Sequence, residues 1–346
     1  MWQSAQAVAL SSRLCYLATG QLVRVDLCAG AHGGPVAHVS GVHHCGSPWA
    51  CPICAPVVRE RRAQEVDLAL SSHLAGGGSG LFITQTVRHS RPDRLEPRVA
   101  LMSSALNATL QGRSWATFKR QLGFVGAIRV VEVTYGQSGW HPHSHSVFVL
   151  EAPVCELEDF GAWIRSRWAS VCERRGFGTL SATHGVDVRP VVVGDGLGGY
   201  LAKVEGGWGV GQELARGDVK RSGRTPFSIL RDAALAGDCE AARLWHEYEA
   251  ATFNKRFLRW SPGLRARLLP NVEELTDIEA ASAEGVGVVL VSVLFEGRTW
   301  DVYVRAGWAG GLLAELERAA VDGDLPDVLD RWHGMLESDL RRYEGA

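Results

Sequence analysis

The alternation of hydrophobic and polar positions divides residues 56–193 into short strands and longer helices. Runs of β-branched and aromatic residues with a period of two predict strands over 81–89, 124–135, 142–151 and 185–193. Helical patterning predicts helices over 56–74, 99–121 and 156–175. From residue 76 the order is strand, helix, strand, strand, helix, strand, followed by a helix. This order predicts an α+β fold with a ferredoxin-like antiparallel sheet and helices on one side.

The segments on either side follow other patterns. Residues 1–40 are rich in Ala, Gly and Ser, and their short β-branched pieces predict a loose lead-in with a hairpin. Residues 216–267 place aromatic residues between Arg and Lys, with a helical part at about 227–257. After a linker near 270–283, we expect strands over 286–294 and 299–305 and helices over 309–321 and 325–343. We therefore expect an N-terminal segment (1–75), a central domain (76–210), a basic helical extension (211–270) and a separate small α/β domain (271–346).

Charge follows the same division. The whole chain has a formal net charge of −2, but residues 271–346 hold 6 Lys and Arg against 16 Asp and Glu. The first 270 residues therefore hold 30 against 22, so a basic body precedes an acidic tail. A basic body is compatible with phosphate binding, although many soluble proteins share this imbalance. The acidic tail could contact a host helicase or polymerase, but such a surface more often serves only solubility.

Composition also indicates the cellular compartment in which we expect the protein. The sequence has no run of 18 apolar residues and no charged-then-apolar leader, so we expect a cytoplasmic protein with no membrane partner. Eight cysteines in 346 residues are too sparse for a disulfide scaffold. Three of them lie within ten residues, at 45, 51 and 54, which favours a metal site in a reducing compartment.

Cys51 and Cys54 have the two-residue spacing that lets both thiolates bind one Zn²⁺ from a tight turn. Cys45 is the expected third ligand. The fourth is either Cys28, which lies 17 residues earlier, or one of His43 and His44. A redox pair and a chance spacing are the alternatives. The neighbouring cysteine and histidines favour structural zinc.

His141, His143 and His145 are two residues apart at the start of an apolar run, so on a strand they project from one face. The preceding strand carries Glu132, and a turn at residues 136–139 would bring this carboxylate beside His143 and His145. Two imidazoles and a carboxylate can bind a divalent ion and leave coordination positions open for substrate. The alternative is that the histidines are merely exposed at the mouth of the strand.

Two further groups of residues follow the fourth predicted strand. A Gly-rich turn opens into Tyr200 and Lys203, which are three apart and would share one face of a helix. Lys220, Arg221 and Arg224 then begin the basic stretch. This stretch could bind DNA phosphate or could be an ordinary helical pair with a solvated basic face, and the pattern favours neither.

Taken in order, these motifs resemble those of a known family. Thr84-x-Thr86, Glu132 before His-Pro-His-x-His at 141–145, and Tyr200-x-x-Lys203 are similar to the three motifs of rolling-circle replication initiators, which are HUH endonucleases. The resemblance is closer to the plasmid Rep proteins of actinobacteria. It rests on Cys-Gly-Ser-x-x-x-Cys-Pro-x-Cys at 45–54, Glu-Val-Thr-x-Gly at 132–136, Gly-Trp-His-Pro-His at 139–143 and Tyr-Leu-Ala-Lys at 200–203. The match covers about residues 28–270 and leaves out the acidic quarter.

The resemblance implies a site-specific DNA nickase that acts at a plasmid origin. His143 and His145 would hold Mg²⁺ or Mn²⁺ with Glu132 as the third ligand, and His141, at the strand end before a proline, is a further candidate. Tyr200 would attack the scissile phosphate, with Lys203 supplying positive charge, to give a covalent 5′-phosphotyrosine and a 3′-OH primer. A phenoxide suits this role because it is both a good nucleophile and a good leaving group, so the strand can later be rejoined.

The chain departs from the family pattern at two places. Ser144 replaces the hydrophobic residue expected between the two metal histidines. Some members of the family carry a glutamate just before the tyrosine. Here Asp195 is the only close carboxylate upstream of Tyr200, so the sequence does not show how the termination cleavage is carried out. Two other functions also stay open: a transposase or relaxase-type HUH nuclease, and a non-catalytic zinc-containing DNA-binding protein in which Tyr200 is a core residue.

Overall fold

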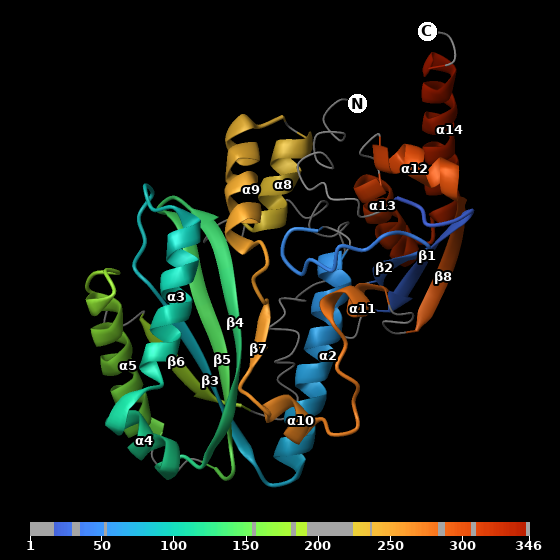
Figure 1. Cartoon of the computed structure of the whole chain (residues 1–346). Coiled ribbons are helices and arrows are strands. Elements are labelled where there is room, and N and C mark those ends of the chain that lie inside the picture. The colour runs from blue at the N-terminus through green and yellow to red at the C-terminus, as the bar shows by residue number, and fades with distance from the viewer. Residues whose placement is uncertain are drawn as a thin grey trace.

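The computed structural model consists of two β-sheets joined and covered by helices (Figure 1). The structure describes residues 17–29, 35–51, 54–153, 157–180, 185–191, 224–235, 237–282, 288–305 and 309–343. Within these residues, every helix is too short or too polar to cross a membrane.

The central sheet has five strands, with the bounds β3 (Ser79–Thr86), β4 (Phe124–Gly136), β5 (Gly139–Leu150), β6 (Val186–Pro190) and β7 (Leu258–Trp260). Their order across the sheet is β6-β3-β5-β4-β7, and every neighbouring pair is antiparallel. Along the chain, α3 (Leu95–Thr109) and α4 (Gly112–Gln121) separate β3 from β4, and α5 (Leu157–Arg174) separates β5 from β6. The four strands predicted from the sequence are present, and β7 adds a fifth at the edge.

The hairpin of β4 and β5 depends on a tight turn between Gly136 and Gly139, which are directly paired. Gly139 has a φ of +87°, and a Cβ placed on it would lie 2.8 Å from the Cα of Arg91. A residue with a side chain would therefore be strained and would also collide with backbone. The turn fixes the register of the hairpin, which places Glu132 directly opposite His143.

Helices cover both faces of the central sheet, so the prediction of helices on one side is wrong. Leu81, Phe148 and the residues that share their face pack against α4, α5 and part of α3. Phe82, Val147 and the other residues of the opposite face pack against α2 (Cys54–Ala75), α8 (Pro226–Leu235) and α9 (Cys239–Thr252). We call this second surface the α9 face. Both faces are apolar in the strands, so both must be covered.

A second sheet joins the two ends of the described chain. It has the order β2-β1-β8, and β1 (Leu22–Ala29) pairs antiparallel with both β2 (Pro35–Ser40) and β8 (Val289–Glu296). One face of this sheet packs against α12 (Gly297–Arg305), α13 (Ala309–Asp322) and α14 (Leu325–Tyr343). The predicted N-terminal hairpin is confirmed, but the C-terminal quarter does not form the separate domain that we expected. The apolar face of the hairpin is buried by residues from the acidic tail.

The structure also changes two elements predicted from the sequence. Residues 299–305 were predicted as a strand but lie in the helix α12, where Trp300, Tyr303 and Val304 are buried. These residues have the spacing i, i+3, i+4 of one helical face, which competes with the period-two reading of the same segment. The predicted helix 99–121 is divided into α3 and α4 by Gly112, which has a φ of +85°.

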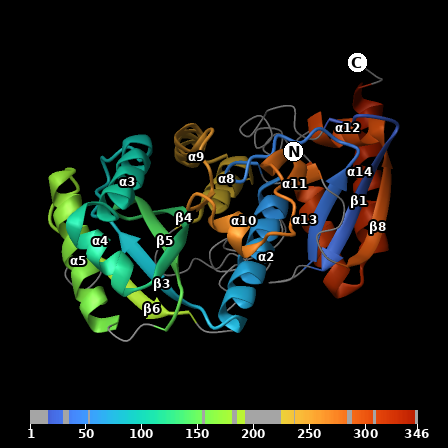
Figure 2. The same cartoon turned by 60° about the horizontal axis from the view of Figure 1, so that its bottom comes forward.

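Helix α2 connects the two sheets and lies between them in both views (Figures 1 and 2). Its first turn contributes Cys54 and Val58 to the core of the second sheet, and its later turns contribute Ala63, Val66 and Leu70 to the core of the α9 face. The short helices α10 (Leu264–Leu268) and α11 (Asp277–Ser282) lie beside it, and both make contacts with it. A single helix therefore packs into the cores of both sheets.

Candidate metal centres

Glu132, His143 and His145 come together on the α9 face of the central sheet (residues of β4 and β5). Glu132 Oε2 lies 2.6 Å from His143 Nε2 and 3.2 Å from His145 Nε2. Two ligands at right angles around an ion, each about 2.1 Å from it, lie about 3 Å apart. The three side chains are between 3% and 14% exposed, so the group is largely shielded from water. This donor set fits a divalent ion and is the one predicted from the sequence.

The second nitrogen of each imidazole has its own partner. His143 Nδ1 donates to the backbone carbonyl of His141 at 3.4 Å, because a carbonyl can only accept. His145 Nδ1 lies 3.1 Å from the hydroxyl of Thr84, which is its direct cross-strand neighbour. Such outer partners fix the tautomer, and here both turn Nε2 toward Glu132. The Thr84 motif on β3 therefore has a structural role in the site.

His141 lies beside this group without joining it. Its ring stacks on His89 with a centroid distance of 4.5 Å, and its centroid lies 5.1 Å from that of His143. Burial, with smaller effects from His143 and His89, lowers the pKa of His141 to about 4. The imidazole is therefore neutral at neutral pH. The sequence analysis named His141 as a further ligand, but the structure groups only the other two histidines with the carboxylate.

Ser144, the departure from the family pattern, points away from the metal group. It is fully buried and its hydroxyl donates to the carbonyl of Val130 at 3.1 Å. Because successive side chains of a strand alternate, the hydroxyl lies on the face opposite His143 and His145. A buried hydroxyl that is hydrogen-bonded costs little, so the sheet tolerates the substitution.

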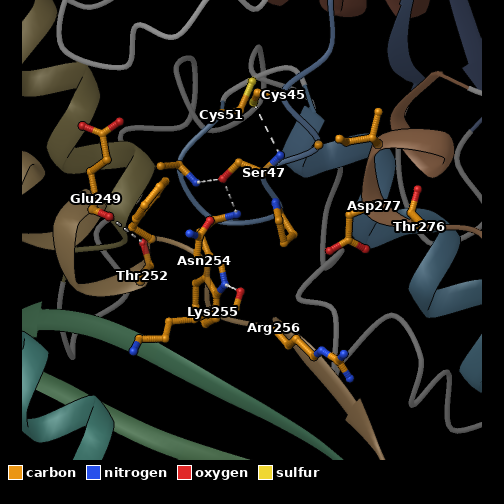
Figure 3. A pocket seen from close by; sticks show the side chains of 16 residues that line it. Cys45, Ser47, Cys51, Glu249, Thr252, Asn254, Lys255, Arg256, Thr276 and Asp277 are labelled. Atoms are coloured by element: carbon orange, nitrogen blue, oxygen red, sulfur yellow. Dashed lines mark hydrogen bonds between the residues drawn. The ribbon is translucent and has the colours of Figure 1, made fainter.

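The loop of residues 45–51, which we call the cysteine loop, is fixed by hydrogen bonds. Ser47 Oγ accepts from the backbone N–H of Trp49 at 3.4 Å and of Ala50 at 3.2 Å (Figure 3). Arg59 on α2 donates through Nε to the carbonyl of Pro48 at 2.7 Å. Trp49 is 4% exposed and belongs to the core of the α9 face. The cysteine loop is thus anchored to the same core as the histidine strand.

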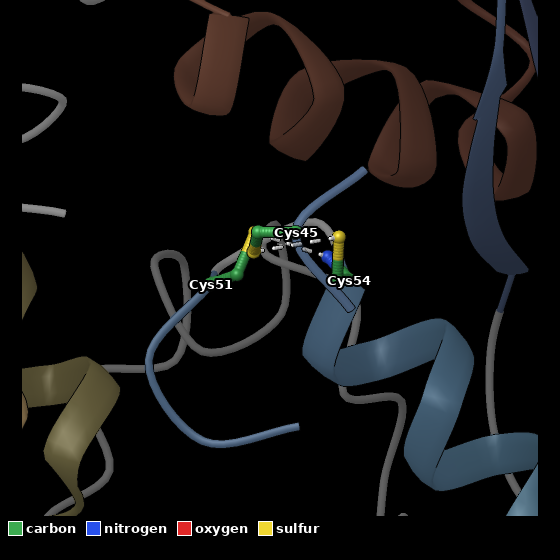
Figure 4. Close-up of side chains that lie close together, drawn as sticks. All are labelled: Cys45, Cys51 and Cys54. Atoms are coloured by element: carbon green, nitrogen blue, oxygen red, sulfur yellow. Dashed lines mark hydrogen bonds between the residues drawn. The ribbon is translucent and has the colours of Figure 1, made fainter. Parts of the chain in front are cut away.

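Three cysteine sulfurs meet where the cysteine loop runs into α2 (Figure 4). The Sγ atoms of Cys45 and Cys54 are 3.9 Å apart, and Cys51 completes the group. Two thiolates on a tetrahedral Zn²⁺, each about 2.3 Å from the ion, lie about 3.8 Å apart. Backbone N–H groups donate to Cys45 Sγ at 3.5 Å and to Cys51 Sγ at 3.3 Å, which stabilises the thiolate form. The arrangement fits the predicted zinc site.

The structure distinguishes the candidates for the fourth ligand. Cys28 lies in β1 with its Sγ 3.9 Å from the carbonyl of Asp26, and it is not grouped with the other sulfurs. His44 Nδ1, in contrast, lies 3.7 Å from Cys54 Sγ. Burial, with a smaller effect of His38, lowers the pKa of His44, which favours the neutral imidazole that a metal requires. The structure thus brings His44, rather than Cys28, to the cluster.

Of the remaining predicted site residues, the structure describes one. Tyr200, Lys203, Lys220 and Arg221 lie outside the described residues. Arg224 is described, and its Nη2 forms an ion pair with Asp232 at 2.7 Å. Its backbone also bridges to Tyr135 at the end of β4. The guanidinium of Arg224 therefore already has a carboxylate partner.

Sequence reasoning missed two contributors to these centres. His89 stacks on His141 although it lies after the end of β3, where no alternation marks its direction. Phe82 stacks on His145 at a centroid distance of 5.5 Å, and the guanidinium of Arg189 lies 4.8 Å from the centroid of the Phe82 ring. Phe82 is two residues before Thr84 on β3, so its face could have been read from the alternation of that strand.

Comparison with known proteins places these centres in a family context. A sequence model described as "Replication protein" matches residues 36–171, which include the cysteine cluster and all three residues of the histidine group. The chain is 28% identical to "Protein rep" of Streptomyces lividans over 77% of its own length and 74% of that protein. It is 32% identical to "Neomycin resistance protein" of Streptomyces cyanogenus, over 32% of this chain and 31% of that protein. No solved structure matches the chain at a significant level. The matches to replication proteins agree with the resemblance drawn from the motifs and support a plasmid replication initiator.

Proposed function

We propose that the protein initiates rolling-circle replication by nicking and rejoining one DNA strand at a plasmid origin. The observation that carries the proposal is the group of Glu132, His143 and His145, which lies within the segment that matches the replication protein family. A divalent ion next to a scissile phosphate is a common requirement of phosphodiester cleavage. The match to replication proteins indicates DNA as the substrate, and the group of Glu132, His143 and His145 could hold the ion that cleavage requires.

The arrangement of the central sheet supports this proposal. The four strands β6-β3-β5-β4 have the order 4-1-3-2 when numbered along the chain, with helices between β3 and β4 and between β5 and β6. This is the order expected of a ferredoxin-like core. Glu132 lies on β4 and the two histidines lie on the neighbouring strand β5, the strand pair that the HUH resemblance implies.

The residues fit Mg²⁺ or Mn²⁺, which when bound would supply positive charge to the non-bridging oxygens of the scissile phosphate. His143 and His145 would hold the ion through Nε2, with Glu132 as the third ligand. The protein contributes orientation, because the Nδ1 atoms are held by the His141 carbonyl and by Thr84. Its burial of the group also limits competing water.

In the proposed reaction, Tyr200 is the nucleophile. Its phenolic oxygen forms a bond to phosphorus, the bond from phosphorus to the 3′ oxygen breaks, and that oxygen leaves as a 3′-OH after taking up a proton. The product is a 5′-phosphotyrosine, which the reverse reaction can rejoin. Lys203, three residues further along the predicted helix, would add positive charge at the phosphate.

The cysteine cluster has a different proposed role. We assign Zn²⁺ there to structure, because the cysteines and His44 could fill a four-coordinate site and so leave no position for substrate. The anchored cysteine loop would then be rigid, which matters because Trp49 on this loop packs into the core beneath the histidine group.

A covalent trapping experiment tests the proposed reaction. Labelled single-stranded oligonucleotides that cover the origin are mixed with the protein and Mn²⁺ and run on a denaturing gel. We expect a labelled protein band that is lost in Tyr200→Phe and His143→Ala, while both variants still bind the origin. A band that persists in Tyr200→Phe would contradict the assigned nucleophile. Tight binding of every strand without any band would favour a non-catalytic DNA-binding protein.

A further inference from the structure

A pocket of about 410 Å³ opens between the cysteine loop and residues 252–256, the segment that connects α9 to β7 (Figure 3). Phe253 lines it and is 51% exposed, which is unusual for a large aromatic side chain. Lys255 and Arg256 line the same pocket. An aromatic ring and two cations thus lie within four consecutive positions on one wall.

Two cationic side chains, those of Lys255 and Arg256, line the pocket. Neither Lys255 nor Arg256 forms an ion pair with any residue that the structure describes. Two carboxylates also line the pocket, and one of them, Asp277, is already paired with Arg62 at 2.8 Å. The other is Glu249 on α9. Two cations that form no ion pair with the described residues favour a nearby anionic group, and the exposed ring favours a flat one.

The two walls of the pocket are held together by direct contacts. The indole N–H of Trp49 in the cysteine loop donates to the backbone carbonyl of Lys255 at 2.8 Å. The ring of Phe257 packs edge-on against Trp49 with a centroid distance of 5.3 Å. Asn254 between Phe253 and Lys255 has a φ of +55°, a left-handed conformation in which the chain turns sharply. The pocket is therefore built in advance, which lowers the entropic cost of binding.

The pocket also connects to the histidine group through the core of the α9 face. Tyr248 donates to the carbonyl of Trp49 at 3.3 Å, and its ring stacks on Trp140 at a centroid distance of 6.2 Å. Trp140 is the residue before His141. In addition, Leu258 of β7 pairs with Val130 of β4, two residues before Glu132. Arg256 precedes Leu258 by two residues. Because the two strands are antiparallel, the step from Leu258 back to Arg256 runs in the same direction as the step from Val130 to Glu132.

We propose that this pocket binds one nucleotide of the single-stranded DNA, with the base stacked on Phe253 and the two flanking backbone phosphates at Lys255 and Arg256. An exposed aromatic ring beside unpaired cations is the combination that proteins use for single strands. The inference rests on the proposed function, since it names a contact for the same DNA. The cysteine loop would then have two roles, because it carries the proposed zinc site and also forms the opposite wall of the nucleotide pocket.

Fluorescence anisotropy with a labelled 15-nucleotide oligo(dT) and a duplex of the same length tests the inference on the full-length protein. We expect Phe253→Ala to weaken oligo(dT) binding at least about fivefold, the lower end for loss of one base stack. Phe253→Leu should lose most of the same affinity, because it keeps apolar bulk without an aromatic face. Binding of the duplex, whose bases are already stacked, should change less than twofold in both variants.

The cations have a closely matched control. The chain carries a second Lys-Arg pair at Lys119 and Arg120, exposed on α4 and therefore on the other face of the central sheet. We expect Lys255→Ala with Arg256→Ala to reduce the slope of log affinity against log salt by about 1.4, the value for two phosphate contacts on a single strand. Lys119→Ala with Arg120→Ala should leave the slope unchanged. Equal slopes in the two double variants would overturn the assignment of phosphate to the pocket.

The outcomes separate this inference from the proposed function. Thermal melting and zinc content of each variant establish that it is folded. If wild-type protein forms the covalent band but Phe253→Ala binds oligo(dT) like wild type, the pocket is not a nucleotide site and the nickase proposal stands. If no strand is ever cleaved but Phe253→Ala still weakens oligo(dT) binding, the pocket stands and the nickase proposal fails. Equal weakening of duplex and single-strand binding would also overturn the proposed base stack.

Discussion

The hydroxyl of Thr84 contacts His145, one of the two imidazoles that we propose bind a metal ion, so this hydroxyl should affect metal affinity. Thr84→Val removes the contact to His145 Nδ1 with little change in shape. We expect Mn²⁺ affinity to fall about 10- to 100-fold, the usual effect of losing an outer-shell partner. Cleavage at saturating Mn²⁺ should recover, because the ligands themselves remain. Isothermal titration with Mn²⁺ measures the affinity, and Thr84→Ser, which keeps the hydroxyl, is the control. Equal affinities for Thr84→Val and wild type would contradict this role.

Local sequence was sufficient to predict the histidine group but not the fourth ligand of the cysteine cluster. Strand alternation set the face of His143 and His145, and the short turn placed Glu132 opposite His143. The choice between Cys28 and His44 depended on contacts that no local pattern records. Cys28 is 1% exposed in the second sheet because β1 pairs with β8, which is distant in the sequence. Its Sγ lies 3.9 Å from the carbonyl of Asp26 and is not grouped with the three sulfurs of the cysteine cluster.

We expect the zinc that we propose for the cysteine cluster to be lost when His44 is replaced and to be retained when its neighbour His43 is replaced. His44→Ala takes away the imidazole that lies 3.7 Å from Cys54 Sγ. We expect its zinc affinity to fall by at least about tenfold, because ligand loss costs no less than loss of an outer-shell partner. His43→Ala is the matched control, since His43 is exposed beside it. Cys28→Ser should keep one zinc per chain. The measurement is zinc content after competition with a chelator.

Loss of zinc from Cys28→Ser with retention in His44→Ala would reverse this assignment. Loss from both variants would show only that the region unfolds, so circular dichroism at the working temperature accompanies each measurement. The two residues lie in different elements, a strand and the loop before α2, so a common effect on folding is not expected.

Elements with one dominant period were predicted correctly, and those with two competing periods were not. The strands around the metal group alternate clearly, whereas residues 299–305 offer apolar positions at both strand and helix spacing. The segment forms the helix α12 rather than a strand, because in a helix Trp300, Tyr303 and Val304 all enter the core beside β8. Tertiary packing therefore decided a pattern that was ambiguous by itself.

At the scale of the whole molecule, the change in charge near residue 270 is not a domain boundary. The net charge of a segment mainly describes its surface, and the acidic tail shares a hydrophobic core with the N-terminal hairpin. Val25 and Leu27 from the hairpin and Leu312 and Leu316 from α13 belong to this one core. No local pattern in the sequence indicates that β1 pairs with β8, because the pairing joins residues more than 260 positions apart.

The shared core predicts that the acidic tail is required to fold the N-terminal sheet. Leu316→Ala on α13 empties a fully buried position, and we expect it to lower the free energy of unfolding by about 2–5 kcal/mol. Val321→Ala on the same helix, where the side chain is 65% exposed, should change it by less than about 0.5 kcal/mol. Denaturant titration measures both. Cys54 lies in this core, so Leu316→Ala should also release zinc at lower denaturant concentrations than Val321→Ala. A chain ending at residue 287 that folded and bound zinc like the full-length protein would show instead that the tail is not required, because such a chain lacks β8, α12, α13 and α14.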